Sequence, residues 1–212
     1  MAKRTLPLVV GAMFEIAGVP SGTITSLIET FQDRRNAKTR AILMEEIGSG
    51  LLHPSDFASA DDVVQIAYRF QRMAERGTAF HNLRLLARVV RGLGKHPPIY
   101  ATDFAKYERL LSDLRREEIF VISELYVRQG HRAINPDGSN VSQAWHAAVQ
   151  SLVPSTFPSE DHFRAWASSA QRSGLLIPGK TIDDIDQMVP SPLLNEVMDL
   201  VSFEDLLADT EE

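Results

Sequence analysis

Residues 174–181 match the phosphate-binding pattern G-x-x-x-x-G-K-[ST], with Gly174, Gly179, Lys180 and Thr181 at its key positions. In a working loop of this kind, backbone amides surround the phosphates, the lysine reaches the terminal phosphates and the hydroxyl binds magnesium. Such a loop follows a buried strand and begins a helix. Here the preceding residues have a helical pattern, and the interior of the loop is Leu-Leu-Ile-Pro. We therefore interpret the match as a helix end followed by a short strand.

Other residue types that could do chemistry lack the required spacing. The chain has no cysteine and no G-x-S-x-G sequence, and none of its six histidines (His53, His81, His96, His131, His146 and His162) forms an H-E-x-x-H pair. Asp183, Asp184 and Asp186 lack the glycine and the terminal glutamate of a calcium-binding EF-hand loop. The sequence therefore predicts a protein that is not an enzyme, with no cofactor and no metal site.

Basic side chains recur at helical spacing between residues 63 and 95, where Glu75 is the single acidic residue. At about 100° per residue they fall within roughly 160° of a helix surface, provided that Gly77 does not break the axis. The seven residues are Arg69, Arg72, Arg76, Arg84, Arg88, Arg91 and Lys95. Such a basic face suits nucleic acid, an anionic lipid surface or an acidic protein. It also suits a solvated helix face that pairs with carboxylates of the same chain.

The other end of the chain has the opposite charge. Residues 181–212 contain ten carboxylates and neither lysine nor arginine; among the ten are Asp183, Asp184, Asp186, Glu204 and Asp205. This asymmetry favours a contact between the basic face and the acidic segment, within one chain or between copies. Nucleic acid is disfavoured as the partner because few aromatic residues lie among the arginines and the isoelectric point is about 5.5.

Helices must position nearly all of these residues, because apolar side chains recur at intervals of three and four. We expect helices over 24–47, from Ser59 towards Gly94, from a Thr102 cap onward, over 117–129, 141–153 and 159–173, and after Pro192. Gly77 is expected either to end the second helix or to allow close packing. The expected buried stripe of that helix is Val63, Ile66, Ala67, Phe70, Met73 and Ala74. A short strand is expected at residues 175–178.

The length of the chain and its helix-breaking prolines indicate the domain organisation. A chain of 212 residues can form one large core or two small ones. Pro97-Pro98 stops the helical pattern, so we place a boundary there, between a helical region 1–96 and a region 99–201 that precedes an acidic tail, 202–212. The apolar stretch Leu6–Val19 contains Glu15 and is too short to span a bilayer, so we expect a buried or interfacial helix and a cytoplasmic protein.

The second half resembles a winged-helix domain over about residues 104–201. Three expected helices lead into Gly174-Leu175-Leu176-Ile177, which a polar segment connects to Met188-Val189-Pro190. The resemblance implies a two-stranded wing after a third helix that normally enters the major groove of DNA. That helix carries Arg164 and Arg172 against Glu160 and Asp161, and the wing is acidic. The resemblance therefore implies a form used for protein contacts.

Together these features predict a mainly α-helical fold with one short β-hairpin. The expected function is a non-enzymatic interaction or regulatory protein that self-associates through its basic face and its acidic segment. Two alternatives remain open from the residues alone. One is a nucleic-acid-binding regulator that uses the arginine-rich helix 63–95, and the other is a peripheral membrane protein that uses the apolar N-terminal helix.

Overall fold

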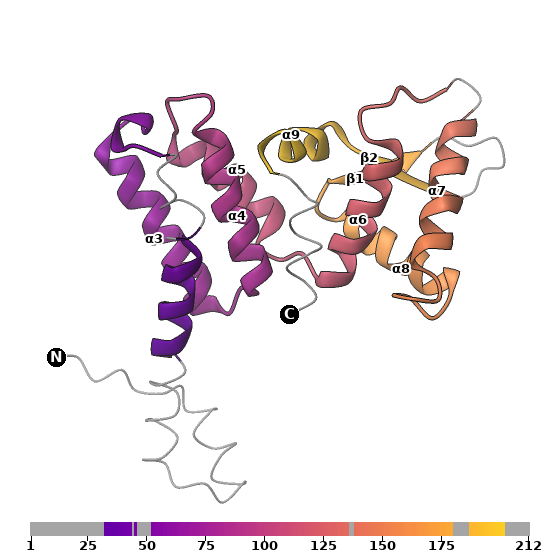
Figure 1. The fold of residues 1–212 in the computed structure, drawn as a ribbon, viewed down its shortest axis with the longest axis horizontal. Coiled ribbons are helices and arrows are strands. Elements are labelled where there is room, and N and C mark those ends of the chain that lie inside the picture. The colour runs from indigo at the N-terminus through magenta and orange to yellow at the C-terminus, as the bar shows by residue number, and fades with distance from the viewer. Residues whose placement is uncertain (1–31, 44, 46–51, 136–137, 180–186, 202–212) are drawn as a thin grey trace, which may run out of the picture.

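The structure, a computed structural model, describes residues 32–43, 45, 52–135, 138–179 and 187–201. In these ranges the chain forms eight α-helices, a 3-10 turn and one antiparallel pair of strands. The predicted mainly α-helical fold with a single short hairpin is confirmed. Two groups of helices lie at opposite ends of the molecule, with the last helix between them (Figure 1).

The first packing group contains the helical residues 32–43 together with α3 (Ala60–Arg76), α4 (Phe80–Leu93) and α5 (Ala101–Leu111). Helix α4 is its centre, because nearly every residue from 82 to 90 is buried. The rings of Phe70 on α3 and Phe104 on α5 stack 5.3 Å apart. Arg35 donates to the carbonyls of Ala74 and Thr78, which attaches helix 32–43 to the end of α3.

Helix α3 begins where the sequence predicts. It ends before Arg84, so it cannot carry all seven predicted basic residues. Ser59 caps it by accepting a hydrogen bond from the backbone N–H of Asp62. Gly77 ends it, with φ of 90° in the left-handed region that favours glycine. Residues 63–95 therefore form two helices joined by a turn: Gly77 ends the first helix, which is one of the two roles expected of it, and the basic helix 63–95 is not continuous.

Two details of α3 and α5 differ from the predictions. Val63 and Ala67 are exposed, because α4 and α5 cover only the face of α3 that carries Ile66, Phe70, Met73 and Ala74. Thr102 does not cap α5, which begins after Tyr100. The N–H of Ala101 instead donates to Asp62 Oδ1 at 2.8 Å, so this cap comes from a neighbouring helix.

The second packing group contains α6 (Arg116–Gln129), α7 (Ser139–Leu152), α8 (Glu160–Gln171), β1 (Leu176–Gly179) and β2 (Gln187–Pro190). The strands pair antiparallel, with Leu176 opposite Pro190 and Gly179 opposite Gln187. The rings of Trp145 and Phe163 meet edge to face at 4.9 Å in the core of this group. Three helices followed by a hairpin is the order that the sequence predicts.

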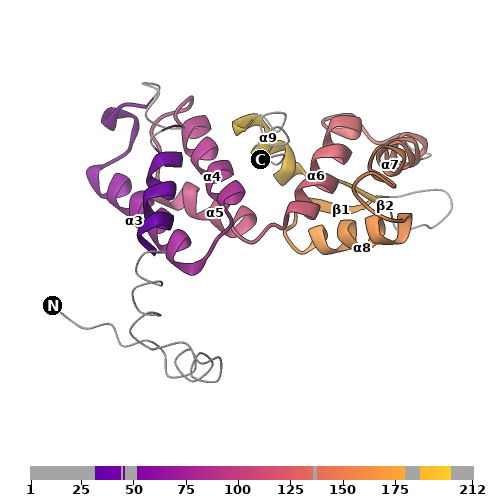
Figure 2. The ribbon, with the colours of Figure 1, turned by 60° about the horizontal axis from the view of Figure 1, so that its bottom comes forward.

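Helix α9 (Pro192–Leu200) lies between the two groups in both views (Figures 1 and 2). Ser191 caps it, and Pro192 occupies its first turn as predicted. The helix contacts α4 and β2. Gly92 of α4 makes this contact possible, because a Cβ there would lie 2.3 Å from the carbonyl oxygen of Leu200.

The connector between the groups, residues 112–115, is held from both sides. Asn82 Nδ2 on α4 donates to the carbonyls of Ser112 (3.0 Å) and Leu114 (2.8 Å). Arg172, at the end of α8, donates to the carbonyl of Asp113 at 2.9 Å. Because α5 packs on α3 and α4, the first packing group continues past Pro97-Pro98 to α5, and the domain boundary at Pro97-Pro98 stays a prediction.

Candidate interaction surfaces

The three basic residues predicted on α3 have three different environments. Arg69 forms a 2.7 Å ion pair with Glu108 of α5. The guanidinium carbon of Arg72 lies 5.8 Å from the centre of the Tyr68 ring, and Arg72 is exposed. Arg76, in the last turn of α3, is also exposed. Only Arg72 and Arg76 of this trio therefore present their charge mainly to solvent.

Three of the four basic residues at 84–95 are less exposed than Arg72 and Arg76. Arg84 forms a 3.3 Å ion pair with Glu45, and Arg88 is 7% exposed. Arg91 is half-buried, whereas Lys95 lies beyond the end of α4 and is exposed. Residues 80–95 contain no Asp or Glu, so every compensating carboxylate must come from another part of the chain or from a partner.

The seven basic residues therefore do not share one surface. The turn at Gly77–Ala79 redirects the chain between α3 and α4, and α4 is packed on several sides by other elements. The prediction that all seven lie within one arc of a helix surface requires a single helix axis. Gly77, in the left-handed conformation, ends α3, so α3 and α4 have separate axes. The structure leaves an α3 trio (Arg69, Arg72, Arg76) and an α4 group (Arg84, Arg88, Arg91, Lys95).

The predicted acidic partners, Asp183, Asp184, Asp186, Glu204 and Asp205, lie outside the described residues. The position from which residues 202–212 continue is nevertheless defined. Val201 is 2% exposed, and the backbone of the preceding residue, Leu200, lies against Gly92. Gly92 directly follows Arg91, so Leu200, two residues before the tail 202–212, lies beside the α4 group.

An exposed stripe on α3 was not predicted from the sequence. Val64 is 65% exposed and Tyr68 is 58% exposed, one helical turn apart, with Arg72 following on the same side. Tyrosine and arginine are common at protein contact sites. The sequence signal for this stripe is the four-residue spacing of Val64, Tyr68 and Arg72. This spacing places them on the side of the helix opposite the buried residues Ile66 and Phe70.

A buried carboxylate, also missed by the sequence analysis, joins α6 to α8. Glu118 has no exposed surface and accepts hydrogen bonds from the N–H of Arg115 (2.8 Å), the hydroxyl of Ser169 (2.6 Å) and the guanidinium of Arg172 (3.2 and 2.8 Å). Burial raises the pKa of this carboxyl, but these donors outweigh burial and hold the pKa below its ordinary value. These hydrogen bonds join the first turn of α6 to the end of α8.

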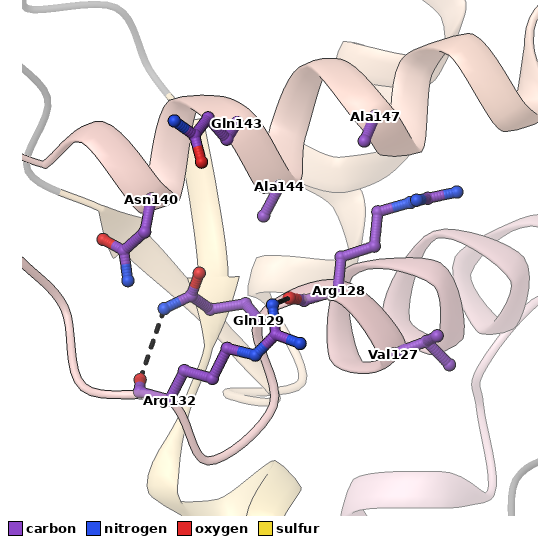
Figure 3. Close-up of a pocket in the computed structure, with 8 residues that line it drawn as sticks. All are labelled: Val127, Arg128, Gln129, Arg132, Asn140, Gln143, Ala144 and Ala147. Atoms are coloured by element: carbon purple, nitrogen blue, oxygen red, sulfur yellow. Dashed lines mark hydrogen bonds between the residues drawn. The ribbon is translucent and has the colours of Figure 1, made fainter.

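Two surface pockets are defined by polar side chains. The α6–α7 groove has a volume of about 340 Å³. Figure 3 shows Arg128, Gln129 and Arg132 across it from Asn140, Gln143 and Ala144. Arg132 donates to the carbonyl of Arg128 at 2.9 Å, and Gln129 donates to the carbonyl of Arg132 at 3.3 Å (Figure 3). Asn140 donates to the carbonyl of Ala133 at 2.7 Å. These hydrogen bonds hold the end of α6 and the loop after it.

The α3–α5 pocket, about 330 Å³, lies where the C-terminal ends of α3 and α5 meet the first turn of α4. Its polar lining comprises Arg76, Thr78, Asn82, Glu108, Ser112 and Asp113. Met73 and Leu114, both buried, form an apolar part of the wall. Asn82, one of its lining residues, is 2% exposed, and its buried Oδ1 has no hydrogen-bond partner among the described residues.

The segment that matches a phosphate-binding loop has the order helix, turn, strand. Gly174 follows α8 with φ of 76°, and Gly179 lies in β1 opposite Gln187. Lys180 and Thr181 lie outside the described residues. A phosphate-binding loop has the reverse order, strand, loop, helix, so the geometry of residues 174–179 does not supply one. Within the described ranges, no three His, Asp or Glu side chains are grouped to hold a metal ion.

Comparison with protein-family models, with curated proteins and with solved structures gives no match to this chain. Of the helices that the structure describes, none combines the length and the apolar character needed to cross a bilayer.

Proposed function

We propose that this protein is a non-enzymatic interaction protein, and that the α4 group binds an acidic segment supplied by residues 202–212. The observation that supports the proposal is the contact between the Leu200 backbone and Gly92, the residue after Arg91, because Leu200 is two positions before residue 202. The segment carries Glu204, Asp205, Asp209, Glu211 and Glu212 and no basic residue. Its charge is therefore opposite to that of α4.

The composition of the two segments supports the proposal. Residues 80–95 carry four basic side chains and neither Asp nor Glu. The acidic segment also carries Phe203, Leu206 and Leu207, apolar side chains that give a docked segment affinity beyond charge attraction.

Residues 202–212 follow α9 directly in the sequence, which favours their binding to α4 of the same chain. Because the segment begins next to its proposed site, its effective concentration there is far higher than that of a segment from another molecule. An acidic segment of a partner protein must displace it, which makes residues 202–212 a competitor that regulates access to α4.

Nucleic acid is a less well supported partner for the predicted arginines. Phosphate binding requires cations that reach the backbone from solvent. Arg88 is buried, Arg84 is paired with Glu45, and Arg69 is paired with Glu108.

The test uses a chain that ends at Val201 and a labelled peptide of residues 202–212. We expect the shortened chain to bind the peptide, the full chain to bind it much more weakly, and affinity to fall as salt increases. Arg91→Glu with Lys95→Glu should weaken binding at least tenfold. The matched control, Arg72→Glu with Arg76→Glu on α3, should leave it unchanged.

Three results would contradict the proposal. They are absence of peptide binding to the shortened chain, equal effects of the α3 and α4 charge reversals, and affinity that does not respond to salt. Mass in solution distinguishes the two sources of the segment, because binding between copies makes the full chain an oligomer that truncation at Val201 converts to monomer.

A further inference from the structure

Helix α3 carries a second set of apolar side chains on a side that the described elements leave exposed. Val64 and Tyr68 are 65% and 58% exposed, and Val63 is 37% exposed. At about 100° per residue, the whole set lies within about 140° of the helix surface. We call this set the α3 patch, and its five exposed members are Ala60, Val63, Val64, Ala67 and Tyr68.

The spacing within the α3 patch is that of a helix face that packs on a partner. The five residues occupy positions i, i+3, i+4, i+7 and i+8, which form the apolar side of an amphipathic helix. Helix α3 already has a buried side, with Ile66, Phe70 and Met73, and it packs on α4 and α5. Contiguous apolar surface beyond such a buried side is typical of an interaction site.

The size of the patch favours a segment of the same chain as its occupant. Standard interfaces between two proteins take about 20–30 residues from each partner, whereas the patch consists of five side chains on one helix. A tethered segment needs less contact area, because the length of the connecting chain sets its effective concentration at the site.

Residues 6–19, which lie outside the described residues, have the composition that the patch requires. Ten of these 14 residues are Ala, Val, Leu, Ile, Met or Phe, and Glu15 is the one charged residue. Removal of such side chains from water is favourable. The charge of Glu15 is opposite to that of Arg72 and Arg76, which follow the patch along α3 and are exposed. The segment therefore matches the patch in polarity and in charge.

The attachment of the first described helix brings residues 6–19 within reach of the patch. Arg35 of this helix donates to two carbonyls at the C-terminal end of α3, and Ala74 supplies one of them. Val64 is ten residues before Ala74, which is about 15 Å along the helix axis. Residues 20–31 span about 18 Å as a helix and about 40 Å when extended, so either conformation covers this distance.

We propose that the α3 patch binds residues 6–19 of the same chain, with Val64 and Tyr68 at the centre of the contact. The apolar side chains of the segment cover the patch, and Glu15 lies on the side of Arg72. This contact removes two apolar surfaces from water at once, that of the segment and that of α3.

The test uses the absence of cysteine from the chain, because an introduced pair is then the only pair of thiols. Gln71 is exposed and lies one helical turn after Ala67, so Gln71→Cys places a thiol beside the patch. It is combined in the full chain with Gly11→Cys or Gly18→Cys, which keep the apolar side chains of the segment. We measure the rate at which a short bismaleimide crosslinks each pair within one chain.

We expect rapid crosslinking of at least one pair, and at least fivefold slower crosslinking when Val64→Ser and Tyr68→Ser are added. The matched control is Val127→Ser on α6, which replaces an apolar side chain that is 62% exposed outside the patch. It should leave the rate unchanged. Circular dichroism spectra of both serine variants should match the wild type, because the replaced side chains are exposed.

Three results would overturn the proposal. The first is equal crosslinking rates in the patch variant and in Val127→Ser. The second is a crosslinked product of twice the chain mass, which would make a second copy the occupant. The third is saturable binding to phosphatidylcholine–phosphatidylserine vesicles that is equal in the wild type and in the patch variant, because a segment bound to α3 is withheld from lipid.

Discussion

Replacement of Arg172 by alanine tests how the second packing group is held to the connector. The guanidinium of Arg172 donates to Glu118 at 3.2 and 2.8 Å and to the carbonyl of Asp113 at 2.9 Å. Removal leaves the carboxylate of Glu118, which has no exposed surface, with only Arg115 N–H and Ser169 as donors. Breaking a buried ion pair from one side typically costs about 3–5 kcal/mol.

The expected loss lies at or below the lower end of this range. About half of the Arg172 side chain is exposed, at 49%, so water can enter its place and solvate part of the carboxylate. We expect the free energy of unfolding to fall by about 2–3 kcal/mol, measured by urea denaturation followed by circular dichroism. Arg164→Ala on the same helix is the control. It removes an exposed 2.7 Å ion pair with Glu160 and should cost less than about 1 kcal/mol.

The pH dependence adds a second readout. The pKa of Glu118 lies below its ordinary value of 4.5 because its donors outweigh burial. A depressed carboxyl pKa gives stability that is complete above 4.5 and is lost as the pH falls through the lower, folded-state value. The stability difference between wild type and Glu118→Gln should therefore shrink below pH 4.5. Equal destabilisation by Arg172→Ala and Arg164→Ala, or a difference that does not change with pH, would refute the reasoning.

Two further predictions concern the contact between α4 and α9 and the protonation of His81. Gly92→Ala should cost about 1–3 kcal/mol and increase amide hydrogen exchange in α9, because the new Cβ meets the backbone of Leu200. Gly77→Ala is its control: a Cβ there meets nothing within 4 Å, so the φ of 90° should cost only about 1–2 kcal/mol and leave exchange in α9 unchanged. Equal exchange in both variants would contradict the proposed packing role of Gly92. Burial lowers the pKa of His81 below 6.5, although the Leu114 carbonyl opposes this shift. Stability should therefore be complete above pH 6.5 and fall as the pH decreases below it. His81→Leu should flatten this part of the stability profile, and an unchanged slope in urea denaturation would argue against a role for this imidazole.

The sequence predicts most of the secondary structure because its signals are local. Ser59 and Ser159 begin helices by binding backbone N–H groups three residues away. Gly77 ends α3 through a backbone conformation that other residues rarely adopt. The hairpin follows from short apolar segments on either side of a polar one. The capping of α5 was not predictable in this way, because its partner, Asp62, is 39 residues away along the chain.

The candidate surfaces depend on contacts that the sequence does not specify. The types and number of the basic residues were evident, but a single left-handed glycine decides whether seven of them share a face. The burial of Arg88, the pairing of Glu118 with Arg172 across 54 residues and the approach of Leu200 to Gly92 are all long-range. The same holds for the unused acceptor of Asn82, since its amide is oriented by carbonyls of the connector.

The sequence by itself determined where helices form, where they end and where charge accumulates along the chain. These properties depend on a residue and its neighbours within one or two helical turns. Only the tertiary structure decided which charged side chains are buried, which form ion pairs and which residues line each pocket. Those properties depend on the relative placement of helices, which arises from the packing of whole faces and from a few close approaches such as Gly92 with Leu200.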